Sequence, residues 1–204
     1  MSYPDPLTDR LLTAENAALL ILDLQPAQIR SVVTIDQERL VEHAAMLCRV
    51  ARLFSLPVIL STLKLNNDSI SSTVPQVAEI VPNAPRIVRT TLNPWEDDRF
   101  LDAVSDTGRR KLVFAALWSE AVLSFAVLSA IQDGYEAYTV IDAIGGTSDL
   151  AQAAALSRMS EAGANQTSCV QLICELQRDC GRTSTVDEFL RLLSEIKGPK
   201  SGGV

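Results

Sequence analysis

The sequence predicts an α/β protein in which helices cover both faces of a mostly parallel sheet. Short apolar runs with the length of strands alternate along the chain with segments of helical periodicity. The runs at 17–24 and 111–117 are apolar almost throughout, which is typical of strands covered on both faces. No turn-rich break divides the 204 residues, of which 47% are hydrophobic, so we expect one core and one domain.

The first half of the chain is expected to supply three strands and three helices. A polar, proline-bearing lead-in at 1–16 is expected along the surface, before a domain that spans 17–197. Pro57 fixes the start of the second strand, and an acidic first turn suits the dipole of the long first helix. The predicted elements are a strand at 17–24, a helix at 36–54, a strand at 56–62, a short helix at 74–80, a strand at 86–89 and a helix at 96–105.

A strand that runs into a helix without a loop dominates the second half. The strand at 111–117 is followed at once by a helix at 119–134, which Gly134 ends as a C-cap. Ser148 and the pattern Thr185-x-x-Glu188 are capping signals for later helices. The other predicted elements are a strand at 135–142, a helix at 148–163, a strand at 166–170, helices at 171–179 and 186–196, and a disordered tail at 198–204.

This alternation predicts a three-layer α/β/α sandwich around a six-stranded parallel sheet with the strand order 3-2-1-4-5-6. Such sheets bind ligands outside the carboxyl ends of their strands, where the order reverses, here between strands one and four. Asp23 ends strand one, Val122 lies at the corner after strand four, and strand three brings Arg89 to the same edge. Asp23 is therefore the leading catalytic candidate, with a helix or loop cap as its alternative role. Valine has no chemistry to offer at the corner.

Composition excludes several classes of partner. The net charge of -7 argues against nucleic acid and anionic membranes, because both would repel the chain. The apolar runs are too short to span a bilayer, and the first residues lack the features of a signal peptide. We therefore expect a soluble, cytoplasmic protein without a membrane partner.

The metal-binding and nucleophilic residues are few. His43 is the one histidine in the sequence, which excludes a multi-histidine metal site and argues against a Ser-His-Asp triad. The four cysteines form no C-x-x-C pair, and we expect most of them to be buried, reduced thiols. No metal and no cofactor are expected, and any catalysis must use carboxylate, guanidinium, amine, hydroxyl and backbone groups.

Six motifs in sequence order resemble those of the isochorismatase-like cysteine hydrolases. The resemblance covers about residues 17–182 and includes Leu-Ile-Leu-Asp-Leu-Gln at 20–25 and Gly-Arg-Arg-Lys-Leu-Val-Phe-Ala-Ala-Leu-Trp-Ser-Glu at 108–120. The other matching segments are 89–97, 133–143, 158–164 and 175–179. It implies a hydrolase fold, homo-oligomers and a small-molecule substrate or ligand.

The resemblance also implies roles for single residues. The family's catalytic set is an Asp after strand one, a Lys or Arg after strand three and a Cys at the strand-four corner. Asp23 and Arg89 match the first two, and Val122 occupies the position of the cysteine. Further departures lie nearby: the family's glycine before the corner is Ala116, its threonine is Ser119, and the tryptophan after Arg-Asp is Cys180.

Three hypotheses follow. In the first, the chain is a pseudoenzyme that binds a small, anionic ligand or none, in a pocket with Asp23 and Arg89 whose wall comprises Asn93, Trp95, Trp118 and Ser119. In the second, it is a cysteine-independent hydrolase, of vinyl ethers or of amides and esters, with Asp23 as general acid or base. In the third, Ser119 is a replacement nucleophile, although no histidine is available to activate it.

Structural roles remain as alternatives for each of these residues. Arg89 is a candidate for an ion pair with Asp23 or Glu120. The two tryptophans suit core packing as well as a pocket wall. The last helix is amphipathic, and we expect it to supply a contact between subunits of a homo-oligomer.

Overall fold

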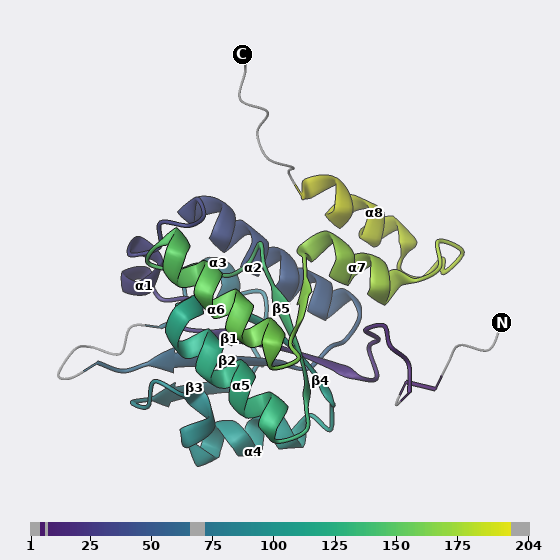
Figure 1. Cartoon of the computed structure of the whole chain (residues 1–204). Coiled ribbons are helices and arrows are strands. Elements are labelled where there is room, and N and C mark those ends of the chain that lie inside the picture. Colours follow the sequence, from purple (N-terminus) through teal and green to yellow (C-terminus); the bar gives the residue numbers. More distant parts are fainter. Residues whose placement is uncertain (1–4, 7, 66–71, 197–204) are drawn as a thin grey trace.

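The structure, a computed structural model, describes residues 5–6, 8–65 and 72–196, and the predicted tail at 198–204 lies outside them. Six parallel strands form one sheet with the order β3-β2-β1-β4-β5-β6, which confirms the predicted architecture (Figure 1). The strands are β1 Ala17–Leu22, β2 Val58–Leu63, β3 Arg86–Arg89, β4 Lys111–Ala116, β5 Glu136–Val140 and β6 Asn165–Thr167.

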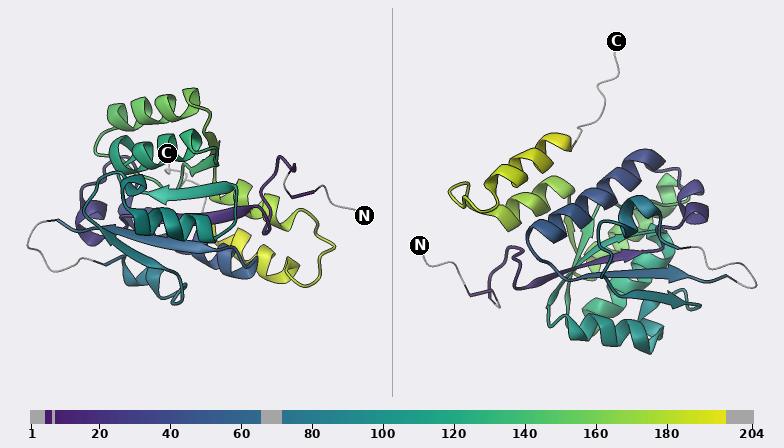
Figure 2. Two further views of the ribbon diagram at one scale, coloured as in Figure 1. Left: turned by 90° about the horizontal axis from the view of Figure 1, so that it is seen from below. Right: turned by 180° about the vertical axis from the view of Figure 1, so that it is seen from behind.

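Helices pack on both faces of the sheet, as the views in Figures 1 and 2 show. Two short helical turns, η1 Pro94–Glu96 and the π-turn η2 Ser119–Leu123, complete the regular elements. The α-helices are α1 Pro26–Arg30, α2 Gln37–Leu53, α3 Pro75–Ala78, α4 Asp98–Asp106, α5 Ser124–Gln132, α6 Asp149–Glu161, α7 Cys169–Gln177 and α8 Val186–Glu195.

Alternate side chains of the central strands supply two separate hydrophobic clusters. Leu19 and Ile21 of β1 belong to a cluster with residues of α2, α3, α7 and α8, which we call the α2 face. Leu20 and Leu22 belong to a second cluster with residues of α4, η2, α5 and α6, which we call the α5 face. Both faces of the central strands are thus covered, which explains why these strands are almost uniformly apolar.

Hydrogen bonds at helix ends explain where the predicted boundaries differ from the structure. The Ser168 hydroxyl accepts from the Gln171 amide, so α7 begins at Cys169 and the last strand ends at Thr167, before the predicted 170. Thr185 forms no side-chain cap, because its hydroxyl donates to Gln177 Oε1. By contrast, Ser148 caps α6 as predicted.

The chain before β1 is attached to the sheet at several points. Leu12 is fully buried, and its amide donates to the Glu175 carboxylate of α7. Lys111 of β4 is also buried, and its Nζ donates to the carbonyl of Asp9 at 2.6 Å. These contacts fix the direction in which the chain enters β1.

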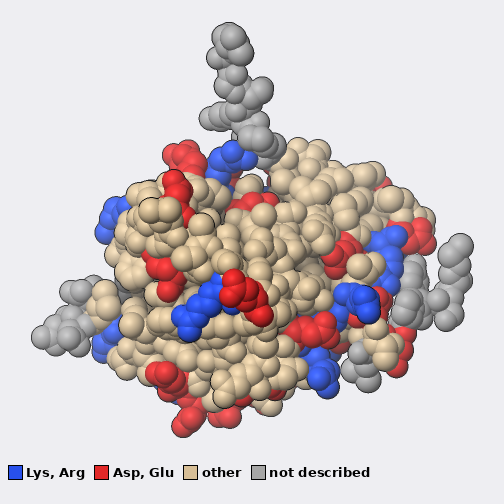
Figure 3. Space-filling model, viewed as in Figure 1, with Lys and Arg blue, Asp and Glu red and all other residues tan. Residues whose placement is uncertain are grey.

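Charges on the visible face are interspersed. Figure 3 shows Lys and Arg next to Asp and Glu across this face, with no broad area of one sign among the described residues. Within the described ranges, no helix combines the length and apolar character needed to cross a membrane.

Candidate functional site

The candidate site lies at the carboxyl ends of β1, β3 and β4. Asp23 directly follows β1 and has a positive φ of 57°, a conformation that Asp tolerates better than most residues. Its amide donates to the Ser61 carbonyl of β2 at 2.9 Å, which extends the pairing of the two strands by one residue. Gln25 then bonds both the amide and the carbonyl of Leu63 through its side chain. These bonds hold the Asp23 backbone in place.

Arg89, the last residue of β3, is buried and points its guanidinium across β2 toward β1. Nη2 lies 2.8 Å from both carboxylate oxygens of Asp23, and both side chains are at most 1% exposed. Nε donates to the Ser61 hydroxyl at 3.2 Å, and Nη1 donates to the carbonyls of Thr91 and Leu92. Each of the three guanidinium nitrogens therefore has at least one oxygen acceptor within the protein. The Arg89 side chain is fully buried and presents no nitrogen to solvent in this conformation.

Burial dominates the electrostatics of Asp23. Loss of hydration raises the pKa of the Asp23 carboxyl to about 6, while the charge of Arg89 and its hydrogen bond act in the opposite direction. A carboxyl group that keeps its proton up to about this pH can act as a general acid near neutrality. The same group is also a partner in a buried ion pair, so its chemistry and its structural role compete.

The corner after β4 contains a cis peptide bond. The peptide bond between Leu117 and Trp118 is cis, and the Ser119 amide donates to the Gly145 carbonyl at 2.9 Å. Val122 lies in the π-turn, is 1% exposed and belongs to the hydrophobic cluster of the α5 face. The valine thus extends the core at the position of the family's nucleophile.

No other described thiol takes the place of the missing cysteine. Cys48 and Cys169 are buried in the cluster of the α2 face, on the other side of the sheet from Val122. Cys174 and Cys180 are exposed. Only two of the four cysteines are buried, so the prediction that most of them would be buried is wrong.

The predicted pocket residues Asn93 and Trp95 are bonded to other parts of the fold. Asn93 caps η1 by accepting from the Trp95 amide, and its Nδ2 donates to the Ser129 hydroxyl of α5. Trp95 Nε1 donates to Asp133 at 2.9 Å, and its ring contacts Phe100 at a centroid separation of 5.5 Å. Both side chains therefore join η1 to the α5 face.

Trp118 and Ser119 also have defined partners. Trp118 Nε1 donates to the Ser31 hydroxyl at 2.7 Å, and its partly buried ring packs against the cluster of the α2 face. Ser119 is fully buried, and its hydroxyl donates to Gln152 Oε1 at 3.3 Å. An amide oxygen is not a base, so nothing in this contact activates the hydroxyl as a nucleophile.

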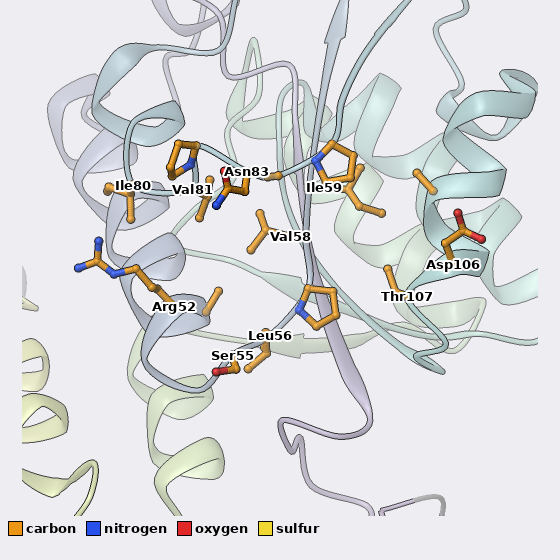
Figure 4. Close-up of a pocket in the computed structure, with 16 residues that line it drawn as sticks. Arg52, Ser55, Leu56, Val58, Ile59, Ile80, Val81, Asn83, Asp106 and Thr107 are labelled. Carbon is orange, nitrogen blue, oxygen red and sulfur yellow. The ribbon is translucent and has the colours of Figure 1, made fainter.

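The described cavities lie away from these residues. One groove has a volume of about 640 Å³ and is lined by the end of α2, the start of β2, the 80–85 loop and the end of α4. Figure 4 shows the side chains that line it. This groove is at the amino end of β2, whereas Asp23 and Arg89 follow the carboxyl ends of their strands. Two further cavities lie beside α1 and beside the lead-in. None of the three is lined by Asp23, Arg89 or Val122.

Two residues of the site were not predicted. Ser61 lies between Arg89 and Asp23, and Gln25 closes the end of the β1–β2 pairing. A sequence signal existed for Ser61, because a buried hydroxyl inside the apolar run 58–63 needs a polar partner. Glu120, the alternative partner proposed for Arg89, instead accepts from the amide and hydroxyl of Thr147.

A double-mutant cycle tests the ion pair. Arg89→Met leaves a buried carboxylate without its partner and should lower the free energy of unfolding by about 3–5 kcal/mol. Asp23→Asn should also destabilise, while the double variant should lose much less than the sum of the two. Chemical denaturation measures all four proteins, and purely additive losses would show that the two side chains do not interact.

The pH dependence of stability tests the state of Asp23. Its pKa is about 6 in the folded chain against 3.8 for the free side chain, so the folded state binds the proton more tightly. This contribution to stability is fully present below pH 3.8 and is lost as the pH rises through about 6. The stability of the wild type relative to Asp23→Asn should therefore increase as the pH is lowered from 7 to 4. Parallel curves for the two proteins would contradict the raised pKa.

Comparisons with known proteins agree with this architecture. Residues 17–171 match the family model of the isochorismatase domain. The probable hydrolase YcaC of Escherichia coli (strain K12) is 31% identical over 169 residues, which cover 82% of this chain and 81% of the relative. Isochorismatase domain-containing protein 2 of Xenopus laevis is 25% identical over 82% of this chain and 79% of its own length.

Two solved structures of YcaC proteins have a similar fold. YcaC from Pseudomonas aeruginosa, with hexane-2,5-diol and covalent acrylamide, has a TM-score of 0.82 and 28% identity over 92% of this chain and 97% of its own. Escherichia coli YcaC, described as an octameric hydrolase of unknown specificity, has a TM-score of 0.81 and 28% identity over 91% and 96%. The family model covers most of the chain, and it agrees with the motifs and with the sheet order. The chain belongs to the isochorismatase family.

Proposed function

We propose that this chain is a pseudoenzyme of the isochorismatase family, which keeps the fold and the Asp–Arg pair but does not perform thiolate hydrolysis. The observation that carries the proposal is the burial of Arg89: its side chain is fully buried, and all three of its guanidinium nitrogens donate to oxygens of the protein itself. Val122, at the position of the cysteine, is buried in the same core as Leu22.

The chemistry of the family explains why these two facts matter together. In a thiolate mechanism the carboxylate takes the proton of the thiol, and a nearby cation stabilises the thiolate. In this chain the carboxylate of Asp23 and the guanidinium of Arg89 bond one another. Val122, between β4 and α5, has no acidic proton to give. The residues that would run the reaction are thus occupied in holding the ends of β1 and β3 together.

We also propose that this chain assembles into a homo-oligomer. The E. coli relative is described as octameric. Two large apolar side chains, Leu150 at the start of α6 and Val33, are 85% and 68% exposed. The two lie in neighbouring segments, since the Val33 amide donates to the carbonyl of Gly146. A contact between subunits would remove them from water.

We also propose a cytoplasmic location, which suits four unpaired thiols of which two are exposed.

A second candidate function rests on the raised pKa of Asp23. A carboxyl with a pKa of about 6 is suited to protonate a vinyl ether, as the second hypothesis from the sequence requires. This function requires a substrate to reach a carboxyl that is 1% exposed and to displace Arg89 from it. A small anionic ligand would likewise have to replace one of the internal acceptors of Arg89. For these reasons the pseudoenzyme is the better-supported proposal.

A turnover panel separates the two candidates. Wild type and Asp23→Asn are assayed on ester, amide and vinyl-ether substrates, after both proteins have been shown to fold. The pseudoenzyme proposal predicts rates equal to the buffer rate for both proteins. Turnover by the wild type that Asp23→Asn reduces by about 10²-fold or more would favour the general acid instead.

Light scattering tests the assembly. The wild-type chain of 22.1 kDa should elute with a mass several times that value. Leu150→Glu should reduce this mass, because it places a charge in the proposed contact. Leu190→Glu on α8 tests the alternative contact by the last helix, since Leu190 is 52% exposed. A wild-type mass of a single chain would contradict the proposal.

A further inference from the structure

A second group of chemically active side chains lies on the other face of the sheet from Val122. It consists of His43 on α2, Asp142 after β5 and Cys169, the first residue of α7. Each offers a metal-ligating atom, and within the described part of the chain these atoms lie within 4.8 Å of one another. His43 and Cys169 are nearly buried, at 8% and 1% exposure, and Asp142 is partly exposed.

Hydrogen bonds to the backbone hold the three residues together. The Asp142 carboxylate accepts from the Cys169 amide at 2.9 Å through one of its two oxygens. His43 Nδ1 lies 2.5 Å from the carbonyl oxygen of Asp142. A carbonyl can only accept, so Nδ1 carries the proton and Nε2 keeps the lone pair. Outer-shell hydrogen bonds of this kind orient the histidines of many metal sites.

The donor set identifies the class of ion. One thiol, one imidazole and one carboxylate match the ligands of Zn²⁺, and catalytic zinc sites commonly use three protein ligands and a water. Zinc–ligand distances of about 2.0–2.3 Å separate tetrahedral donors by roughly 3.5 Å, so the present spacing would have to close by about 1 Å. Small rotations of the three side chains supply a movement of this size. The partly exposed Asp142 gives the ion and the water a route from solvent.

We propose that His43, Asp142 and Cys169 form a binding site for Zn²⁺ or a similar borderline divalent cation. This proposal departs from the expectation of no metal, whose stated ground, the one histidine in the sequence, excluded multi-histidine sites only. The bound ion would join α2 and α7 to the end of β5, and the thiol would lose its proton to solvent on binding. Because the site lies on the α2 face, its expected effect is on stability and does not depend on the pseudoenzyme proposal.

The experiment uses a background in which the two exposed thiols are removed, Cys174→Ser with Cys180→Ser, so that they cannot bind the ion. Zn²⁺ is added to the metal-free protein, and Tm and the amount of bound zinc per chain are measured. Co²⁺ is then used as a spectroscopic probe, because a thiolate ligand produces a charge-transfer band in the near ultraviolet. We expect one ion per chain, a higher Tm and this band.

Two variants test the assignment of the ligands. Asp142→Asn keeps an oxygen that can accept from the Cys169 amide, so the start of α7 should be preserved while zinc affinity falls more than about tenfold. Cys169→Ser should abolish the cobalt band. Asp149→Asn, an exposed acid at the start of α6, is the matched control and should leave binding unchanged. The proposal is overturned if the background protein binds no zinc, if the cobalt band is absent, or if Asp142→Asn binds as tightly as the control.

Discussion

The buried pair of Asp23 and Arg89 is the interaction on which the rest of the site depends. The order β3-β2-β1 places Arg89 two strands away from Asp23, and the guanidinium spans the intervening strand by bonding Ser61 on the way. Three adjacent strands are thus joined at their carboxyl ends by one side chain. A buried charge is tolerated only when it is well bonded, and here each of the three guanidinium nitrogens has an acceptor.

Asp23 and Arg89 match two of the family's catalytic residues, but we propose a different role for them in this chain. The same carboxylate and cation would serve a thiolate reaction if a cysteine lay beside them. In the proposed pseudoenzyme, with Val122 in the core, the pair has no thiol to act on, and its effect is to fix the geometry of the strand ends. Such a pair adds little net stability, because removing two charges from water is costly, but losing one partner is severe. This asymmetry gives a physical reason for keeping both residues after the nucleophile is gone.

Much of the fold follows from local pattern, and the errors have identifiable causes. Apolar runs predicted the strands inside the sheet, because central parallel strands are buried on both faces. The edge strands β3 and β6 were also predicted, although both are short and more polar. The boundary between β6 and α7 was misplaced because Ser168 ends the strand by capping the helix. Helix α1 was not predicted as an element, although Pro26 stands at its first turn, where proline is favoured.

The site could be predicted only in part. Strand ends and topology brought Asp23 and Arg89 to one edge, and the structure shows their contact. The assignment of Asn93 and Trp95 to a pocket wall stays a prediction, while their observed partners, Ser129 and Asp133, come from α5. Sequence spacing does not show which of two nearby helices a loop residue will bond. Burial of the site likewise depends on packing between elements that are far apart in the chain.

The account is tested most directly by nuclear magnetic resonance of the Arg89 guanidinium, assigned by comparison with Arg89→Met. If the guanidinium is buried and bonded only within the protein, its N–H resonances should be resolved, exchange slowly with water and stay unchanged when acetate, benzoate or phosphate is added. Guanidinium resonances that exchange as fast as those of the exposed Arg99, or that shift as an anion is titrated, would contradict the account, because Arg89 would then have donors available for a ligand.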